Sequence, residues 1–183
     1  LAKEVRGLAV RIDMGDGNSI LNAVNTITKE IGTSGSLVAV VLGASPPPAL
    51  EPFLKISKEQ LSYQMNVNLI GQTILLQNLI KSVFKKKRVG TVVGILTEAI
   101  GCEERPPATG MGSYVIAKSA LKSLLSICSA EYSWLKVRTV SPGFTKTPML
   151  DVFDPRYLEM VHARKPILAP EEVAIDILEQ IEQ

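Results

Sequence analysis

The chain has 183 residues, enough for one well-buried core and too few for two domains of ordinary size. Hydrophobic residues make up 46% and charged residues 21%, and the net charge is +2, which argues against nucleic-acid-binding and anionic-membrane-binding classes. We therefore expect a single domain over residues 1–183, with no nucleic-acid or membrane partner. Because the chain begins with Leu1 and not Met, we expect it to be part of a longer protein.

Four apolar runs rich in β-branched residues predict buried strands. They show little alternation of polar and apolar residues, which is typical of parallel strands covered on both faces. Helical patterns separate the runs, and strand–helix alternation indicates an α/β fold with a parallel sheet and flanking helices. The strands are expected over residues 7–14, 36–44, 90–97 and 135–143.

The helices are expected between and after these strands. The second helix opens at Ser57, where Ser57 and Gln60 have the spacing of a capping box. The last helix opens at Pro170, a favourable residue for a first helical turn. The four helical stretches run over residues 19–32, 57–84, 113–134 and from 170 to the end.

The cysteines and the single histidine predict neither a disulfide framework nor a metal site. Cys102 and Cys128 lack metal-ligand spacing and indicate plain thiols in a reducing compartment, so we expect a cytoplasmic protein. His162 stands in a polar stretch flanked by proline and is expected at the surface. The basic run at 85–88 is expected to be a solvated helix end.

In parallel α/β sheets, ligands bind beyond the carboxyl ends of the strands. Here the segments that follow the expected strands, together with the opening of the last helix, resemble the short-chain dehydrogenase/reductase family in the right order. The resemblance covers essentially the whole chain and implies a Rossmann-like sheet. The matching stretches are VRIDM (10–14), NVNLIG (66–71), Tyr114 to Lys118, SPGFTKTPM (141–149) and LAPEEVA (168–174).

The resemblance implies a catalytic set. Tyr114 would exchange a proton with the substrate oxygen, and Lys118, one helical turn on, would lower the phenol pKa from its usual value of about 10. Thr97 stands where the family carries a serine that hydrogen-bonds the substrate oxygen, and Asn68 would anchor a water in the proton relay. A shift of one residue would place Glu98 at the serine position, and a carboxylate there argues against turnover.

The resemblance also implies a nicotinamide cofactor. The family's first strand and Gly-rich turn hold the pyrophosphate, and its second strand selects NAD or NADP. Residues 7–14 correspond to the third strand, so the domain is expected to be truncated at its N-terminus, with the choice of cofactor undetermined. Strand 7–14 would then pair with 36–44, pair with another chain, or stay poorly ordered. The implied cofactor contacts are Asp13, Gly43, Ala44, Lys118, Pro142, Gly143 and Thr147.

Plainer interpretations stay open for several of these residues. Asn68 could be a buried asparagine that bonds backbone, and Thr147 a turn or cap residue. Asp13 could cap the helix that begins near Ser19. Residues 149–166 resemble the family's substrate lid and also suit an ordinary surface loop.

Two functions remain open. The first is an oxidoreductase that reduces a carbonyl, or oxidises an alcohol, with NAD or NADP. The second is an inactive relative kept as a structural or dimerisation module, in which Tyr114 and Lys118 are only a polar pair on a helix. In either case we expect a homo-oligomer formed through the helices at 57–84 and 113–134.

Overall fold

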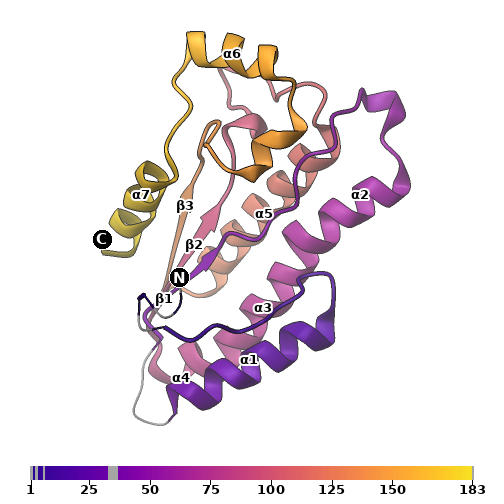
Figure 1. Cartoon of the computed structure of the whole chain (residues 1–183). Coiled ribbons are helices and arrows are strands. Elements are labelled where there is room, and N and C mark those ends of the chain that lie inside the picture. Colours follow the sequence, from indigo (N-terminus) through magenta and orange to yellow (C-terminus); the bar gives the residue numbers. More distant parts are fainter. Residues whose placement is uncertain (1, 3, 6, 33–36, 183) are drawn as a thin grey trace.

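The computed structural model describes residues 2, 4–5, 7–32 and 37–182. At its centre is a parallel sheet in the order β1-β2-β3 (Figure 1). Its central strand, β2, is buried from Gly90 to Gly94, because helices cover both of its faces. The three later predicted strands are confirmed in shorter form, except that Ser36 lies outside the described residues. The strands are β1 (Ala39–Leu42), β2 (Gly90–Ile95) and β3 (Leu135–Val140).

The predicted strand at 7–14 is wrong. Residues 7–13 carry no regular structure, and the apolar side chains of Leu8 and Ile12 are exposed. The segment crosses the helical layer instead of joining the sheet edge (Figure 1). The end of the segment packs closely against the helical run at Gly71, because a Cβ at Gly71 would lie 2.0 Å from the carbonyl oxygen of Met14. An apolar, β-branched run therefore packs against helices, although β1 lies at the edge of the sheet.

One face of the sheet is covered by helices that form the main core. Leu76, Leu121 and Leu125 pack there against strand residues such as Val92. The helix α5 crosses closely over β2, since a Cβ at Gly94 would lie 2.2 Å from Leu125 Cδ1. The elements of this layer are α1 (Gly17–Ile31), α2 (Lys58–Met65), η2 (Asn66–Gly71), α3 (Gln72–Leu79), η3 (Ile80–Phe84), α4 (Lys85–Lys87) and α5 (Gly112–Glu131).

The predicted helix over 57–84 is confirmed, with wider turns at η2 and η3. Its capping box is present: the Gln60 amide donates to Ser57 Oγ at 3.1 Å, and the Ser57 amide donates to Gln60 Oε1 at 3.0 Å. The helical run ends at Arg88, whose φ of 50° and ψ of 40° are left-handed. All four residues of the basic run are exposed, as predicted for a helix end.

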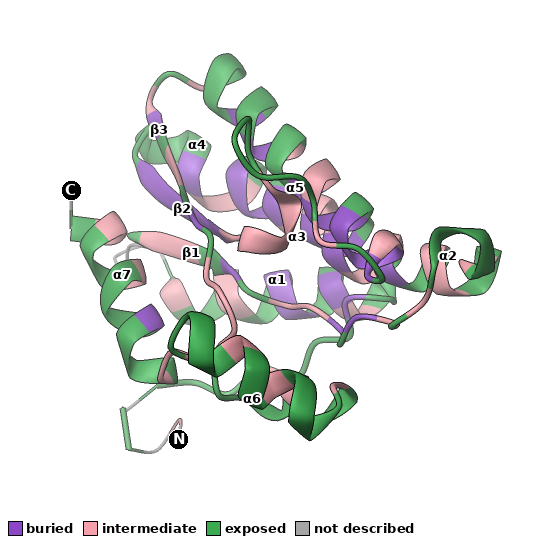
Figure 2. Ribbon diagram, turned by 90° about the horizontal axis from the view of Figure 1, so that it is seen from above, coloured by how far each residue is buried: buried purple, intermediate pink, exposed green. Residues whose placement is uncertain are grey.

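The other face of the sheet is covered by α7 (Pro170–Glu182). Val173 packs there against Val93 and Val140. Pro170 begins the helix, as predicted. The helix covers β2 and β3, whereas Val41 on β1 remains 40% exposed (Figure 2).

Between β3 and α7 the chain builds a cover over the carboxyl end of the sheet (Figure 1). The cover consists of η5 (Pro148–Val152) and α6 (Pro155–Arg164), and Asp154 caps α6. Two further short 3-10 helices are η1 (Phe53–Lys55) and η4 (Glu98–Ile100). His162 is exposed, and both cysteines are free thiols, Cys102 exposed and Cys128 buried. In the described part of the chain, none of the helices has the length and apolar character needed to cross a bilayer.

Candidate active site

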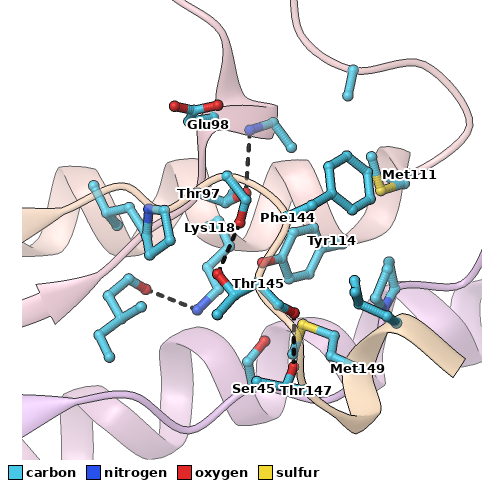
Figure 3. A pocket seen from close by; sticks show the side chains of 18 of the residues that line it. Ser45, Thr97, Glu98, Met111, Tyr114, Lys118, Phe144, Thr145, Thr147 and Met149 are labelled. Atoms are coloured by element: carbon cyan, nitrogen blue, oxygen red, sulfur yellow. Dashed lines mark hydrogen bonds between the residues drawn. The ribbon is translucent and has the colours of Figure 1, made fainter. Parts of the chain in front are cut away.

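A cavity of ≈ 430 Å³ lies beyond the carboxyl ends of the three strands. Its walls come from the segments that follow β1, β2 and β3, from the first turns of α5, and from the cover formed by η5 and α6 (Figure 3). This is the position at which ligands bind in parallel α/β sheets. Val173 of α7 also lines it, so the fold brings the ends of all three strands, α5 and α7 to one hollow.

Tyr114 and Lys118 lie on the same face of α5, and both line this cavity. Lys118 is only 1% exposed, and its Nζ donates a hydrogen bond to the carbonyl oxygen of Ile95 at 2.9 Å. The same nitrogen is 5.9 Å from the centroid of the Tyr114 ring. The spacing of four residues has thus placed an ammonium beside the phenol, as the helical period requires.

The pKa values of the pair are set mainly by burial. Burial lowers the pKa of Lys118 from 10.5 to about 8. Burial also raises the pKa of Tyr114, and a hydrogen bond with the side chain of Thr97 opposes that rise without cancelling it. The prediction of a lowered phenol pKa is therefore wrong for this structure. Desolvation disfavours the phenolate more than its neighbours favour it.

Thr97, and not Glu98, faces the tyrosine. The Thr97 hydroxyl interacts with Tyr114 and accepts a hydrogen bond from the amide of Ala99 at 3.2 Å. The Glu98 carboxylate turns toward the rim, where it pairs with Lys165 at the end of α6 and with Arg105. Of the two residues that the sequence left as alternatives, Thr97 is the one whose side chain contacts Tyr114.

Asn68 does not line the cavity. It is fully buried in η2, where its Nδ2 donates to Gln64 Oε1 at 2.8 Å. Gln64 in turn donates to the carbonyl oxygen of Pro47 at 2.7 Å. Asn68 Oδ1 is buried without a hydrogen-bond partner among the described residues. These contacts tie the helix to the loop that follows β1. Asn68 is buried, as the plainer interpretation expects, but its hydrogen-bond partner is a side chain and not the backbone.

Four of the predicted cofactor contacts besides Lys118 line the cavity, and two do not. Gly43, Pro142, Gly143 and Thr147 are in its wall. Ala44 is not, and its carbonyl oxygen instead accepts from Gln72 Nε2 at 2.8 Å.

Asp13 also lies away from the cavity wall. Its carboxylate is exposed and accepts from the amide of Gly15 at 2.8 Å. It does not cap the first helix, because Asp16 occupies the cap position and accepts from the amide of Asn18 at 2.9 Å. The helix consequently begins at Gly17, two residues before the position expected from the sequence.

Thr147 takes part in a chain of turn contacts. Its hydroxyl donates to the carbonyl oxygen of Thr145 at 3.4 Å, and the Thr145 hydroxyl donates to that of Gly143 at 3.2 Å (Figure 3). The predicted turn role is present, and the side chain also reaches the cavity wall.

Several wall residues were missed by the sequence analysis. The polar ones include Arg105, and also Ser45 and Thr145, which both follow strands and could have been found from that position. The apolar ones include Met111, Phe144, Phe153 and Tyr157. Phe153 precedes α6 in extended backbone and Tyr157 lies in its first turn, so no helical spacing in the sequence signals that the two rings meet.

The donor set at Lys118 fits the ribose of a nicotinamide nucleotide. An ammonium has three N–H donors, and the Ile95 carbonyl takes one of them. The remaining donors belong to a buried group in the cavity wall, where two adjacent hydroxyl groups could accept them. A group of His, Cys, Asp or Glu side chains able to hold a metal ion does not occur within the described residues.

Comparisons with known proteins identify the family and the fold. A family model described as enoyl-(acyl carrier protein) reductase matches residues 1–177. A 3-oxoacyl-(acyl-carrier-protein) reductase of Thermotoga maritima is 26% identical over 188 aligned positions, covering 97% of this chain and 73% of that protein.

Solved structures share the fold. An alcohol dehydrogenase from Thermococcus sibiricus superposes with a TM-score of 0.76 and 18% identity, over 94% of this chain and 67% of that one. A putative gluconate dehydrogenase from Agrobacterium tumefaciens superposes with a TM-score of 0.82 and 18% identity, over 98% of this chain and 71% of that one. The protein ElxO with NADP bound superposes with a TM-score of 0.78 and 19% identity, over 93% of this chain and 68% of that one. These structures show the shared fold. The family model, which matches residues 1–177, shows that the chain belongs to the short-chain dehydrogenase/reductase family.

Proposed function

We propose that this chain reduces a carbonyl group to an alcohol, or runs the reverse reaction, with NAD or NADP as cofactor. The observation that carries the proposal is the juxtaposition of Tyr114, Thr97 and Lys118 in one cavity wall. A phenol, a hydroxyl and a buried ammonium on one side of a hollow form a proton-donating surface for a carbonyl oxygen.

The protonation states suit the direction of reduction. Because burial raises the pKa of Tyr114, the phenol carries its proton near neutral pH and can donate it to the oxygen of the substrate. The Lys118 ammonium then stabilises the phenolate that remains. The Thr97 hydroxyl donates a hydrogen bond to the same substrate oxygen and holds it near the phenol.

The cofactor's nicotinamide, when bound, supplies the hydride that reaches the carbonyl carbon. Lys118 would hold the adjoining ribose through its remaining donors, and Gly43 and Gly143 would line the approach to it. The relative ElxO binds NADP, and we leave the choice between NAD and NADP open.

The first experiment is calorimetric titration of the purified chain with NADH and with NADPH, followed by an assay of cofactor oxidation with a panel of ketones and aldehydes. The Tyr114→Phe variant should lose turnover and keep cofactor binding. Tyr63→Phe is the matched control, because Tyr63 is 59% exposed on α2 and does not line the cavity. Equal turnover in the Tyr114→Phe variant and the native chain would refute the assignment.

A second candidate is the dimerisation module, and one observation favours self-association. Tyr63 and Ile70 are exposed seven residues apart on α2 and η2, and Ile116 and Ile127 are exposed eleven residues apart on α5. Both spacings place the pair on one side of a helix, and α2 and η2 pack beside α5. A second copy of the chain would cover this apolar surface.

We also propose a cytoplasmic location. Cys102 is an exposed free thiol, which a reducing compartment preserves.

A further inference from the structure

The cavity wall divides into a polar part and an aromatic part. Thr97, Tyr114 and Lys118 form the polar part (Figure 3). In the aromatic part, the Phe144 ring meets Phe153 edge to face, with centroids 5.2 Å apart. In Figure 3, Phe144 and Met111 lie on the side of Tyr114 away from Lys118.

The aromatic part is fixed by contacts within the cover. Tyr157 on α6 stacks on Phe153, with ring centroids 5.9 Å apart and planes inclined by 15°. Tyr157 also lies 6.2 Å from Phe144, so the three rings form one cluster. Aromatic pairs in these orientations are stabilised by the interaction between the rings in addition to the burial of their surface. The cluster therefore gives the cavity a preformed apolar wall.

Two of the acidic residues beside the aromatic part have partners within the chain. Glu98 contacts Lys165 and Arg105. The Asp154 carboxylate accepts hydrogen bonds from the amides of Arg156 and Tyr157. Glu51, in the wall of the adjoining groove, keeps Oε2 buried without a hydrogen-bond partner among the described residues, and most other residues of that wall are apolar. A largely apolar wall favours an apolar substrate body over a polyhydroxylated one.

An apolar groove continues from the aromatic side toward η1. It shares Ala108, Met111, Phe153 and Tyr157 with the cavity. Its outer wall includes Leu50, Pro52, Phe53 and Pro107. Phe53 is 79% exposed although it lines the groove, whereas its neighbour Leu54, which is 94% exposed, lines neither hollow.

We propose that the substrate is a carbonyl compound with an elongated apolar or aromatic body, and that Phe53 is a specificity-determining residue. The inference rests on the proposed function, because the carbonyl is taken to lie at Tyr114 and Thr97. The body then passes Met111 and the aromatic cluster and ends against Phe53. Because the groove and the cavity share wall residues, one substrate molecule would occupy both.

The test is a set of dissociation constants for ketones that share one reacting group. Acetone, benzylacetone and the biphenyl analogue of benzylacetone extend progressively along the groove. Dihydroxyacetone is the polar control for acetone. Binding is measured by ligand-observed NMR on the full chain, so turnover is not needed. We expect the biphenyl analogue to bind at least about tenfold more tightly than benzylacetone, because it buries a further ring.

The variants assign that gain to one residue. Phe53→Ser should weaken binding of the biphenyl analogue by about fivefold or more and leave benzylacetone unchanged, whereas Leu54→Ser should change neither. Equal affinities for the two aromatic ketones, or tighter binding of dihydroxyacetone, would overturn the inference. So would a Phe53→Ser variant that alters sedimentation but no ketone affinity, since the groove would then contact another protein molecule.

Failure of the proposed function gives a different pattern. If the ketone series and the Phe53→Ser variant behave as expected but no ketone is reduced, the groove is supported and the reductase proposal fails. If ketones are reduced without preference for the apolar body, the reductase proposal stands and the substrate inference fails.

Discussion

The Nζ atom of Lys118 lies 5.9 Å from the centre of the Tyr114 ring, in a position that is 1% exposed. Both groups thus titrate in an environment that disfavours charge, and burial moves their pKa values in opposite directions, down for the lysine and up for the tyrosine. Near neutral pH the pair holds a protonated phenol and a mostly charged amine. This state is the one that carbonyl reduction requires.

The Lys118 shift makes stability depend on pH. Its folded pKa of about 8 is below the ordinary 10.5, so the unfolded chain binds more protons between these values. The free energy of unfolding should therefore gain a contribution as pH rises through this window, up to about 3 kcal/mol. Urea unfolding at several pH values should show the slope in the native chain and in Lys122→Met, an exposed lysine on the same helix. Lys118→Met should lose it, and a slope that persists there would contradict the assignment.

Thr97 should be needed for turnover as a hydroxyl. Thr97→Val keeps the shape and removes the hydrogen bond to Tyr114, so we expect the proposed reductase activity to fall by about a hundredfold in kcat/KM. Thr97→Ser should recover most of it. Steady-state kinetics on the two variants decide this, and a valine variant as active as the serine variant would exclude a hydroxyl role.

Glu98 should contribute little to stability. It forms ion pairs with Lys165 and Arg105, whose side chains are 57% and 52% exposed. Ion pairs as exposed as these stabilise a fold by roughly 0–1 kcal/mol. Glu98→Gln should change the free energy of unfolding by less than about 1 kcal/mol and make protease cleavage in α6 faster, because Lys165 loses its partner. Glu103→Gln, at an exposed position in the neighbouring loop, is the control and should have no effect on either measurement.

Gly71 should tolerate no side chain. A Cβ there would lie 2.0 Å from the backbone oxygen of Met14, so Gly71→Ala should destabilise the chain by about 2–4 kcal/mol. Gly17→Ala is the matched control, since its Cβ would meet nothing closer than Ile74 Cδ1 at 3.9 Å. Thermal unfolding compares the two. A neutral Gly71→Ala would mean that the N-terminal loop does not pack as described.

Self-association should depend on α5. Ile127→Asp puts a charge on the exposed face of this helix and should shift the sedimenting species toward monomer. Ile175→Asp, on the exposed side of α7, should leave it unchanged. If the native chain sediments only as a monomer at high concentration, the proposal of self-association is refuted.

The elements with strong local signals could be predicted from sequence. Ser57 and Gln60 fix a helix start through contacts three residues apart, and Pro170 does so through its own ring. The spacing of Tyr114 and Lys118 was enough to place them together. These features depend on near neighbours, which the sequence displays directly.

The errors arose where distant contacts decide the outcome. Residues 7–14 have the composition of a strand, but composition does not reveal whether a pairing partner is present. The position of Thr97 relative to Glu98 depends on how one peptide turns at the end of β2, which no spacing encodes. Asn68 matched a motif, yet its surroundings place it in a network with Gln64.

The order of the strands has a consequence for how the chain folds. The pairings in the sheet join residues 52 positions apart between β1 and β2, as Ala39 with Thr91, and 45 positions apart between β2 and β3, as Gly90 with Leu135. No hairpin can nucleate the sheet, so topology of this kind favours slow folding. On the ribosome, β1 emerges long before β2 and waits unpaired while the helices between them form. During this interval Val40 and Val41 lack their partners on β2, and unpaired apolar strands of this kind are prone to aggregate.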